Sequence, residues 1–187
     1  MSIEQDQLRV IELAMGWSPP VWLFGGFAED AVLSGQVTRP HVDIDLLAFR
    51  DDLPVLLTRA AGIGFERFTV RWQNLDGQPL AAGSVAGGID LEFCIADRTH
   101  EDNAYFGFPS SAGAIRMWLP KDAFGFTLLA GIPVRTVSPL ILFQTREVLA
   151  GLLGGQRPKD VLAQQALKDK FFLDLGPDQL APRIEPA

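Results

Sequence analysis

Hydrophobic residues recur along the chain with the two periods that are typical of helices and of strands. Between residues 3 and 15, the apolar residues Ile3, Leu8, Ile11 and Met15 are separated by polar and charged residues, as in an amphipathic helix. Further along, short apolar runs bounded by glycine, proline or aspartate are typical of strands. The pattern predicts helices at residues 3–15, 27–33, 53–62, 138–153 and 158–173, and strands at residues 21–24, 41–49, 65–73, 79–86, 89–96 and 131–137. This mixture indicates the α+β class with a mixed sheet.

Two segments lack a clear period. Residues 97–126 are irregular and rich in glycine, proline and aromatic residues. A stretch of this length inside a compact domain is functional or contains short strands that the pattern does not reveal. Residues 176–187 contain three prolines, and we expect them to form a flexible tail.

The composition narrows the class of protein. With 187 residues, 48% of them hydrophobic and 21% charged, the chain has the length and composition of one globular domain. The net charge of −7 argues against nucleic-acid binding, which needs a basic surface. The single cysteine, Cys94, excludes an intramolecular disulfide and lies in an apolar run, as a structural thiol does. Without a signal peptide or a long apolar segment, the sequence predicts a cytoplasmic protein that does not bind membranes.

Two carboxylates stand two positions apart on the predicted strand at residues 41–49. Because alternate residues of a strand share a face, Asp43 and Asp45 point the same way, roughly 7 Å apart along the chain. Their repulsion amounts to roughly 2–3 kcal/mol at an effective dielectric constant of about 20. A cation between them would relieve it, and Mg²⁺ takes one or two protein carboxylates together with waters and substrate phosphates. The spacing therefore predicts a magnesium site.

A diglycine turn precedes this strand. Gly25 and Gly26 join the strand at residues 21–24 to the helix at residues 27–33. Glycine lets the backbone approach a phosphate closely, and the free N–H groups at a helix N-terminus favour anions. A phosphate-binding turn beside metal-binding carboxylates is typical of active sites that catalyse phosphoryl-type transfer.

Each of four further residues near these motifs has two possible roles. Arg39 and His41 flank the entry to the carboxylate strand; either could contact a phosphate, and either could be structural. Lys159, in the first turn of the last helix, can reach a phosphate as a point charge or simply be solvated. Asp30 could pair with Arg39 or contact the substrate.

A third acidic position lies on the apolar strand at residues 89–96. If this strand pairs with the strand of Asp43 and Asp45, it brings Asp90 opposite them. Two metal ions about 3.5–4 Å apart, bridged by such carboxylates, would clamp the attacking and leaving oxygens of an in-line displacement. Asp90 could also accept a proton from an acceptor hydroxyl, with Glu92 as the runner-up. The alternative is that Asp90 and Glu92 form the solvated face of a half-exposed strand.

The aromatic residues of the irregular stretch are candidates for a substrate pocket. Tyr105, Phe106, Phe108 and Trp118 could surround a base or an acceptor, or belong to the core. We expect the acceptor pocket to be built by residues 97–121 and the last two helices.

The motifs together resemble a known family. Residues 25–30 (Gly-Gly-Phe-Ala-Glu-Asp), Gly35 and residues 38–46 (Thr-Arg-Pro-His-Val-Asp-Ile-Asp-Leu) are similar to the signature of small antibiotic nucleotidyltransferases. The resemblance is to the aminoglycoside 2″-nucleotidylyltransferase and lincosamide nucleotidyltransferase group of the polymerase-β-like superfamily. The resemblance extends over most of residues 20–170, and only the block at residues 25–46 is specific. Weaker similarity continues through residues 89–92, 131–135 and 157–160.

The resemblance implies a fold and a division of the chain. The expected fold is polymerase-β-like, a twisted mixed sheet flanked by helices with a C-terminal helical segment. Residues 1–137 would form the nucleotidyltransferase catalytic domain, and residues 138–175 the helical segment that closes the cleft. Residues 176–187 would remain a flexible tail.

The resemblance also implies a reaction. With two Mg²⁺ ions, a nucleoside monophosphate, expected to be AMP from ATP, is transferred from a nucleoside triphosphate to a hydroxyl of an aminoglycoside-like or lincosamide-like small molecule, and pyrophosphate is released. Asp43 and Asp45 would hold the metals, and Asp90 would ligate a metal and act as the base. Gly25 and Gly26 would cradle the triphosphate. Gly26 stands where many members of the superfamily have serine, which removes one hydroxyl contact. The expected phosphate contacts are Arg39, His41 and Lys159, and the candidate substrate contacts are Asp30, Glu92, Tyr105 and Trp118.

Two other functions stay open at this point. One is a nucleotidyltransferase of the toxin–antitoxin kind that modifies RNA or protein, although the acidic charge disfavours RNA. The other is a catalytically silent nucleotide-binding module, which the presence of all three aspartates disfavours. The sequence does not decide the acceptor, a resistance role, the nucleotide preference, the choice between Asp90 and Glu92 as base, or whether the protein is a monomer or a homodimer.

Overall fold

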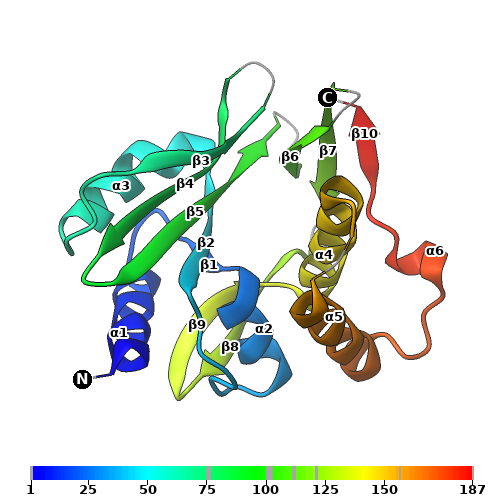
Figure 1. The fold of residues 1–187 in the computed structure, drawn as a ribbon, viewed down its shortest axis with the longest axis horizontal. Helices are drawn as coiled ribbons and strands as arrows, with labels where there is room; N and C mark the ends of the chain where they lie inside the picture. Colours follow the sequence, from blue (N-terminus) through cyan, green and yellow to red (C-terminus); the bar gives the residue numbers. More distant parts are fainter. Residues whose placement is uncertain are drawn as a thin grey trace.

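The computed structural model describes residues 2–74, 77–99, 103–110, 113–120, 122–155 and 157–186 (Figure 1). Its helices are α1 (Ile3–Met15), α2 (Gly25–Leu33), α3 (Leu53–Ala61), α4 (Pro139–Leu153), α5 (Pro158–Phe171) and α6 (Pro177–Leu180), with a short 3₁₀ helix at Arg50–Asp52. Its strands are β1 (Trp22–Leu23), β2 (Asp43–Phe49), β3 (Thr69–Gln73), β4 (Pro79–Ala86), β5 (Ile89–Arg98), β6 (Ala104–Ser110), β7 (Gly113–Leu119), β8 (Phe124–Leu129), β9 (Ile132–Val137) and β10 (Ile184–Pro186).

The strands form one mixed sheet that forks at β5. Its main path runs β10-β7-β6-β5-β2-β1-β9-β8, with β2 parallel to β5 and β1 parallel to β9. Along the edge of β5 away from β2, residues 89–94 pair with β4 and residues 96–98 pair with β6. Strands β3 and β4 therefore form one branch and β6, β7 and β10 the other, as Figure 1 shows. The expected α+β class with a mixed sheet is confirmed.

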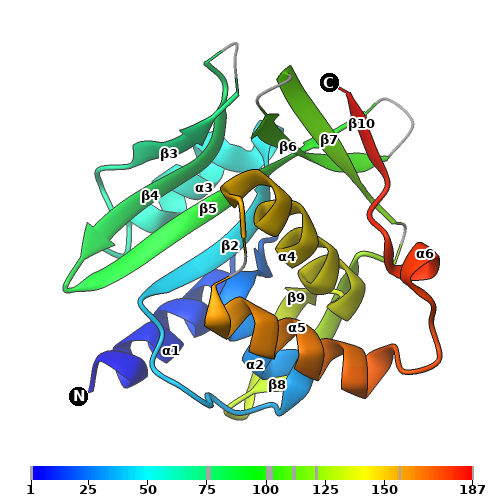
Figure 2. The ribbon, with the colours of Figure 1, turned by 45° about the vertical axis from the view of Figure 1, so that its right-hand side comes forward.

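The alternation of side chains on β2 and β5 separates a core face from a polar face. Ile44, Leu46, Leu91 and Phe93 are completely buried. The alternating positions carry the acidic residues, on the face that α2, α4 and α5 cover. Figure 2 shows α4 and α5 crossing this face, with α3 behind the sheet. Among the described residues, no helix combines the length and the apolar character needed to cross a bilayer.

The irregular stretch contains a β-hairpin that the hydrophobic pattern does not reveal. Strands β6 and β7 pair along their whole length, from Ala104 opposite Leu119 to Ser110 opposite Gly113. Gly107 and Pro109 interrupt the pattern, since both residue types are disfavoured in strands. Gly107 also allows close packing, because a Cβ there would lie 3.0 Å from Leu80 Cδ2 and the leucine side chain would have to shift.

Two short elements, α6 and β10, lie in the segment for which a flexible tail is expected. Strand β10 pairs antiparallel with β7, from Ile184 opposite Met117. Leu180 is buried, and the side-chain amide of Gln144 donates to the carbonyl oxygens of Leu180 and Ala181, both at 3.2 Å. This segment thus has tertiary contacts, although its prolines suggested no regular structure. The boundary between a catalytic domain and a helical segment at residue 137 stays a prediction.

Candidate active site

A cleft of about 500 Å³ opens on the polar face of the sheet. From the sheet, β2 and β5 contribute the carboxylates of Asp43, Asp45 and Glu92. From the other side, α4, the start of α5 and the loop before β2 contribute cations. These are Arg146, Arg157, Lys159 and Arg39.

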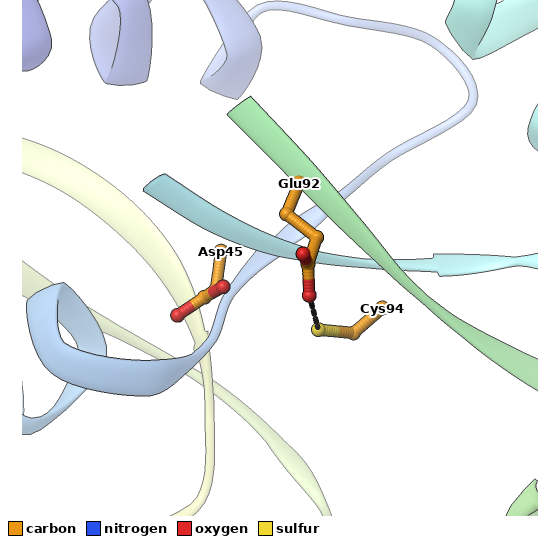
Figure 3. Close-up of side chains that lie close together, drawn as sticks. All are labelled: Asp45, Glu92 and Cys94. Atoms are coloured by element: carbon orange, nitrogen blue, oxygen red, sulfur yellow. Dashed lines mark hydrogen bonds between the residues drawn. The ribbon is translucent and has the colours of Figure 1, made fainter. Parts of the chain in front are cut away.

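The strand register brings the acidic residues together. In the parallel pair of β2 and β5, Asp43 lies opposite Asp90 and Asp45 lies opposite Glu92. Figure 3 shows the carboxylates of Asp45 and Glu92 beside the thiol of Cys94; one ligand atom from each residue lies within 4.8 Å of the others. Burial and the neighbouring carboxylates raise the pKa of the Cys94 thiol, so it stays protonated and is a poor metal ligand. The oxygen atoms of the group suit a hard cation such as Mg²⁺.

The electrostatics of these carboxylates fit a cation site. Burial, then the charges of Asp43 and Glu92, raise the pKa of Asp45 to about 8. Burial, followed by the charges of Asp43 and Asp90, also raises the pKa of Glu92. Carboxylates that repel one another in this way are stabilised in the charged form by a bound cation.

Asp90 occupies the expected strand position but is engaged elsewhere. The Nη2 atom of Arg71 on β3 donates to both carboxylate oxygens of Asp90, at 3.1 and 3.0 Å. Their side chains are 37% and 30% exposed. Gly83 makes room for this pair, because a Cβ there would lie 2.7 Å from Arg71 Nε. Asp90 is not among the described residues that line the cleft, whereas Glu92 is.

The two glycines let other site residues approach the start of α2. Gly25 has a φ of +57°, and a Cβ there would lie 1.9 Å from Asp45 Oδ2. A Cβ on Gly26 would lie 2.5 Å from His41 Nδ1. The diglycine therefore has a packing role that the sequence analysis did not foresee. Its role as a phosphate cradle stays a prediction.

His41 and Asp30 form a buried pair that fixes the loop before β2. His41 Nε2 lies 2.8 Å from Asp30 Oδ2, and their side chains are 3% and 6% exposed. The backbone N–H of Thr38 donates to Asp30 at 2.9 Å. Burial would raise the pKa of Asp30, but the hydrogen bonds from His41 and Thr38 outweigh it and lower that pKa. His41 reaches the cleft wall, but its Nε2 atom is occupied by Asp30.

The three arginines of the cleft are held by an ion-pair network that links three helices. Arg146 on α4 pairs with Glu29 on α2 at 2.6 Å and with Asp160 on α5 at 2.8 Å. Asp160 also pairs with Arg157 at 2.6 Å, and Glu29 with Arg39 at 3.3 Å. The anticipated pairing of Arg39 with Asp30 is therefore wrong.

Arg146 and Glu29 are residues of the site that sequence reasoning missed. Their side chains are only 12% and 3% exposed. They are 117 positions apart in the chain, and no local pattern connects them. The available signal was a single basic residue, Arg146, on a mostly apolar helix.

The structure does not bring Tyr105 and Trp118 to the cleft. They face one another across the β6–β7 pair, with ring centroids 5.4 Å apart. Phe106 and Phe108, on the alternate positions of β6, line a pocket that adjoins the cleft. Residues 100–102, 111–112 and 121 of the expected acceptor pocket lie outside the described residues.

Solved structures with this fold belong to nucleotidyltransferases. The lincosamide antibiotic adenylyltransferase LnuA, lincomycin-bound, has a TM-score of 0.64 at 18% identity, over 88% of this chain and 96% of that one. The enzyme ANT(2″)-Ia, in complex with adenylyl-2″-tobramycin, has a TM-score of 0.65 at 21% identity, over 95% and 92%. A putative nucleotidyltransferase from Thermotoga maritima has a TM-score of 0.53 at 15% identity, over 89% and 94%. These likenesses establish the fold.

The fold, the cleft and the sequence together define an enzyme of the nucleotidyltransferase class. Residues 7–139 match the family model of the aminoglycoside-2″-adenylyltransferases, and the chain belongs to this family. Sequence comparison with curated proteins gives no match.

Proposed function

We propose that the protein is a Mg²⁺-dependent nucleotidyltransferase that transfers AMP from ATP to a hydroxyl of a small molecule. The observation that carries this proposal is the two-sided cleft, with carboxylates on the sheet and cations on the helices. A triphosphate chelated by a metal needs both kinds of group, since the metal requires oxygen ligands and the phosphates require cations. Membership of an adenylyltransferase family supports ATP as the donor.

In this proposal the sheet side binds the metal. Asp43 and Asp45 hold Mg²⁺ through their oxygens, as the resemblance implies, with Glu92 next to them. When bound, the metal neutralises charge on the reacting phosphates. The proximity of Asp45 and Glu92 and the raised pKa of both carboxyls support this assignment.

The helix side binds the triphosphate. Lys159, Arg157 and Arg39 line the cleft and supply donors for phosphate oxygens. Arg146 is fixed by Glu29 and Asp160 and is pre-organised to do the same. Charge-assisted contacts of this kind stabilise the negative charge that accumulates on pyrophosphate as it leaves.

Glu92 is the better candidate for the base. In the proposed step the acceptor hydroxyl oxygen bonds to the α-phosphorus, the bond from that phosphorus to the bridging oxygen breaks, and pyrophosphate leaves with the electron pair. The hydroxyl proton passes to a carboxylate. Glu92 lines the cleft, whereas Asp90 is paired with Arg71 and is not among the described residues that line it.

The acceptor follows from the relatives. LnuA is an adenylyltransferase of lincosamide antibiotics, and ANT(2″)-Ia was solved with an adenylylated tobramycin. We propose an antibiotic-like hydroxyl compound of one of these kinds as the acceptor.

The test measures the release of pyrophosphate from ATP, in the presence of Mg²⁺, with each member of a panel of aminoglycosides and lincosamides as the acceptor. The Asp43→Asn variant, checked for native thermal unfolding, is the blank. We expect release that depends on the acceptor and that falls at least about a thousandfold in the variant. Equal release by the two proteins would refute the metal assignment. If the wild type binds ATP·Mg²⁺ but releases no pyrophosphate with any of these compounds, the choice of acceptors is refuted.

A further inference from the structure

A second pocket, of about 140 Å³, adjoins the cleft at the fork of the sheet. We call it the apolar pocket. The residues that it shares with the cleft are Phe24, Trp72, Glu92, Cys94, Thr145 and Leu149. The residues that line it alone come from the start of β4 and the middle of β6. They are Leu80, Ala81, Phe106, Gly107 and Phe108.

The walls of the apolar pocket offer very little polarity. Phe106 stacks against Phe24 at 5.4 Å and lies 6.2 Å from Phe108, so three aromatic rings form one side. The hydroxyl of Thr145 is engaged, donating to the carbonyl of Ile141 at 2.8 Å. Of the described residues around this pocket, Glu92 alone carries a charge.

The position of the pocket relative to the cations assigns it to the acceptor. Arg39, Arg146, Arg157 and Lys159 line the cleft and are not among the described residues of the apolar pocket. Pyrophosphate leaves toward these cations. In an in-line displacement the attacking oxygen enters from the opposite side of the phosphorus. Glu92 stands at the junction of cleft and pocket, where it can accept the proton of that hydroxyl.

We propose that the apolar pocket binds an apolar group of the acceptor, close to the hydroxyl that is modified. This inference rests on the proposed function and narrows its substrate class. A cavity of about 150 Å³ with apolar walls can hold benzene, so the pocket is sized for one ring or a short alkyl chain. The ammonium groups of a polycationic acceptor would not enter this pocket, because burying them beside a single carboxylate is costly. The acceptor class is therefore a hydroxyl compound that carries an uncharged, apolar group near the modified hydroxyl.

Two probes separate this class from the polycationic one. Lincomycin combines sugar hydroxyls with an alkyl-bearing ring and one basic nitrogen, whereas tobramycin carries several amino groups. Calorimetric binding of each compound to Asp43→Asn, in which transfer is blocked, tests the pocket without chemistry. Steady-state AMP transfer by the wild type tests it with chemistry. We expect lincomycin to bind and to have at least a tenfold higher kcat/KM than tobramycin.

Phe108→Ala tests the pocket itself, and Tyr105→Ala is its matched control. Both residues are partly exposed aromatic residues of β6, and they lie on opposite faces of the strand. We expect Phe108→Ala to raise the KM for lincomycin about tenfold while leaving the KM for ATP unchanged. Tyr105→Ala should change neither value. Thermal unfolding confirms that each variant is folded.

The outcomes distinguish the two proposals. Transfer to tobramycin in preference to lincomycin supports the proposed function and overturns the apolar acceptor. Binding of lincomycin that depends on Phe108, without AMP transfer, supports the pocket and refutes the reaction. Failure to bind lincomycin, or an unchanged KM in Phe108→Ala, overturns the pocket assignment.

Discussion

The candidate active site has two ends, the cleft (polar end) and the apolar pocket beside it (apolar end), and they are built in different ways. At the polar end, Gly25 lies against Asp45, and Arg146 is fixed between Glu29 and Asp160. Arg39 and Arg157 are likewise held by ion pairs with Glu29 and Asp160. At the apolar end, Phe106, Phe108 and Leu80 present hydrophobic surface with hardly any directional contact. In the proposed function, the polar end carries out the nucleotidyl transfer and the apolar end selects the acceptor.

The largest expected effect separates two neighbouring carboxylates of β5. We predict that Glu92→Gln lowers kcat about a hundredfold, because a positioned base contributes about that much. Asp90→Asn should lower kcat only a few-fold, because Asp90 is paired with Arg71 outside the cleft. The measurement is steady-state pyrophosphate release at saturating ATP and acceptor. The reverse order of effects would return the role of base to Asp90, as the family resemblance implies.

A smaller effect is expected where a glycine lies against Asp45 in the proposed metal site. Gly25 and Gly87 have nearly equal φ angles, +57° and +58°, but an added Cβ meets Asp45 only at Gly25 and meets nothing within 4 Å at Gly87. Each Gly→Ala substitution costs about 1–2 kcal/mol in backbone strain. We predict that Gly25→Ala loses about 1–3 kcal/mol more in the free energy of unfolding, by denaturant titration, because the Asp45 carboxylate must move.

Activity provides the second measurement for this pair. Gly25→Ala should lose most of its transfer activity, and Gly87→Ala should keep it. Equal stability and equal activity of the two variants would show that the contact between Gly25 and Asp45 is unimportant.

A further prediction is a dependence of stability on pH. The pKa of Asp45 is about 8 in the folded protein, against an ordinary value of 3.8. Between these values the folded state binds the proton more tightly than the unfolded state, so this group stabilises the fold at low pH. Its contribution is lost as the pH rises through about 8. We predict that the Tm of the metal-free protein falls over this range, by about 2–4 °C for each kcal/mol lost.

Asp45→Asn is the control for this slope, because its side chain does not titrate. The difference in Tm between the variant and the wild type should grow in favour of the variant as the pH rises. Added Mg²⁺ should raise the Tm of the wild type most at the high-pH end. A constant difference across the range would contradict the shifted pKa.

Much of the polar end could be predicted from the sequence because its determinants are local. The diglycine turn, Asp43 and Asp45 lie within about one turn–helix–strand unit, and strand alternation fixes which way the carboxylates point. The pairing of Asp90 opposite Asp43 was also predicted correctly. The ion pair between Asp90 and Arg71 was not predicted, because it depends on the register in which β3 pairs with β4 and β4 pairs with β5.

The apolar end was harder to predict because its residues come from distant segments. Gly107 and Pro109 hide the strand period of β6, and only pairing with β5 and β7 reveals it. The choice between Phe106 and Tyr105 as pocket residues depends on the register of that hairpin, since a shift of one position exchanges the two faces. The ion pair of Arg146 with Glu29 likewise exists only once α2 and α4 are packed.

Binding of a non-hydrolysable ATP analogue, with and without Mg²⁺, tests the two-sided cleft most directly. Calorimetry on the wild type, Asp45→Asn and Lys159→Ala compares the sheet side with the helix side. The account predicts tight binding by the wild type only with Mg²⁺, loss of the Mg²⁺ effect in Asp45→Asn, and roughly tenfold weaker but still Mg²⁺-dependent binding in Lys159→Ala. Binding by all three proteins that is equally strong with and without Mg²⁺ would contradict it.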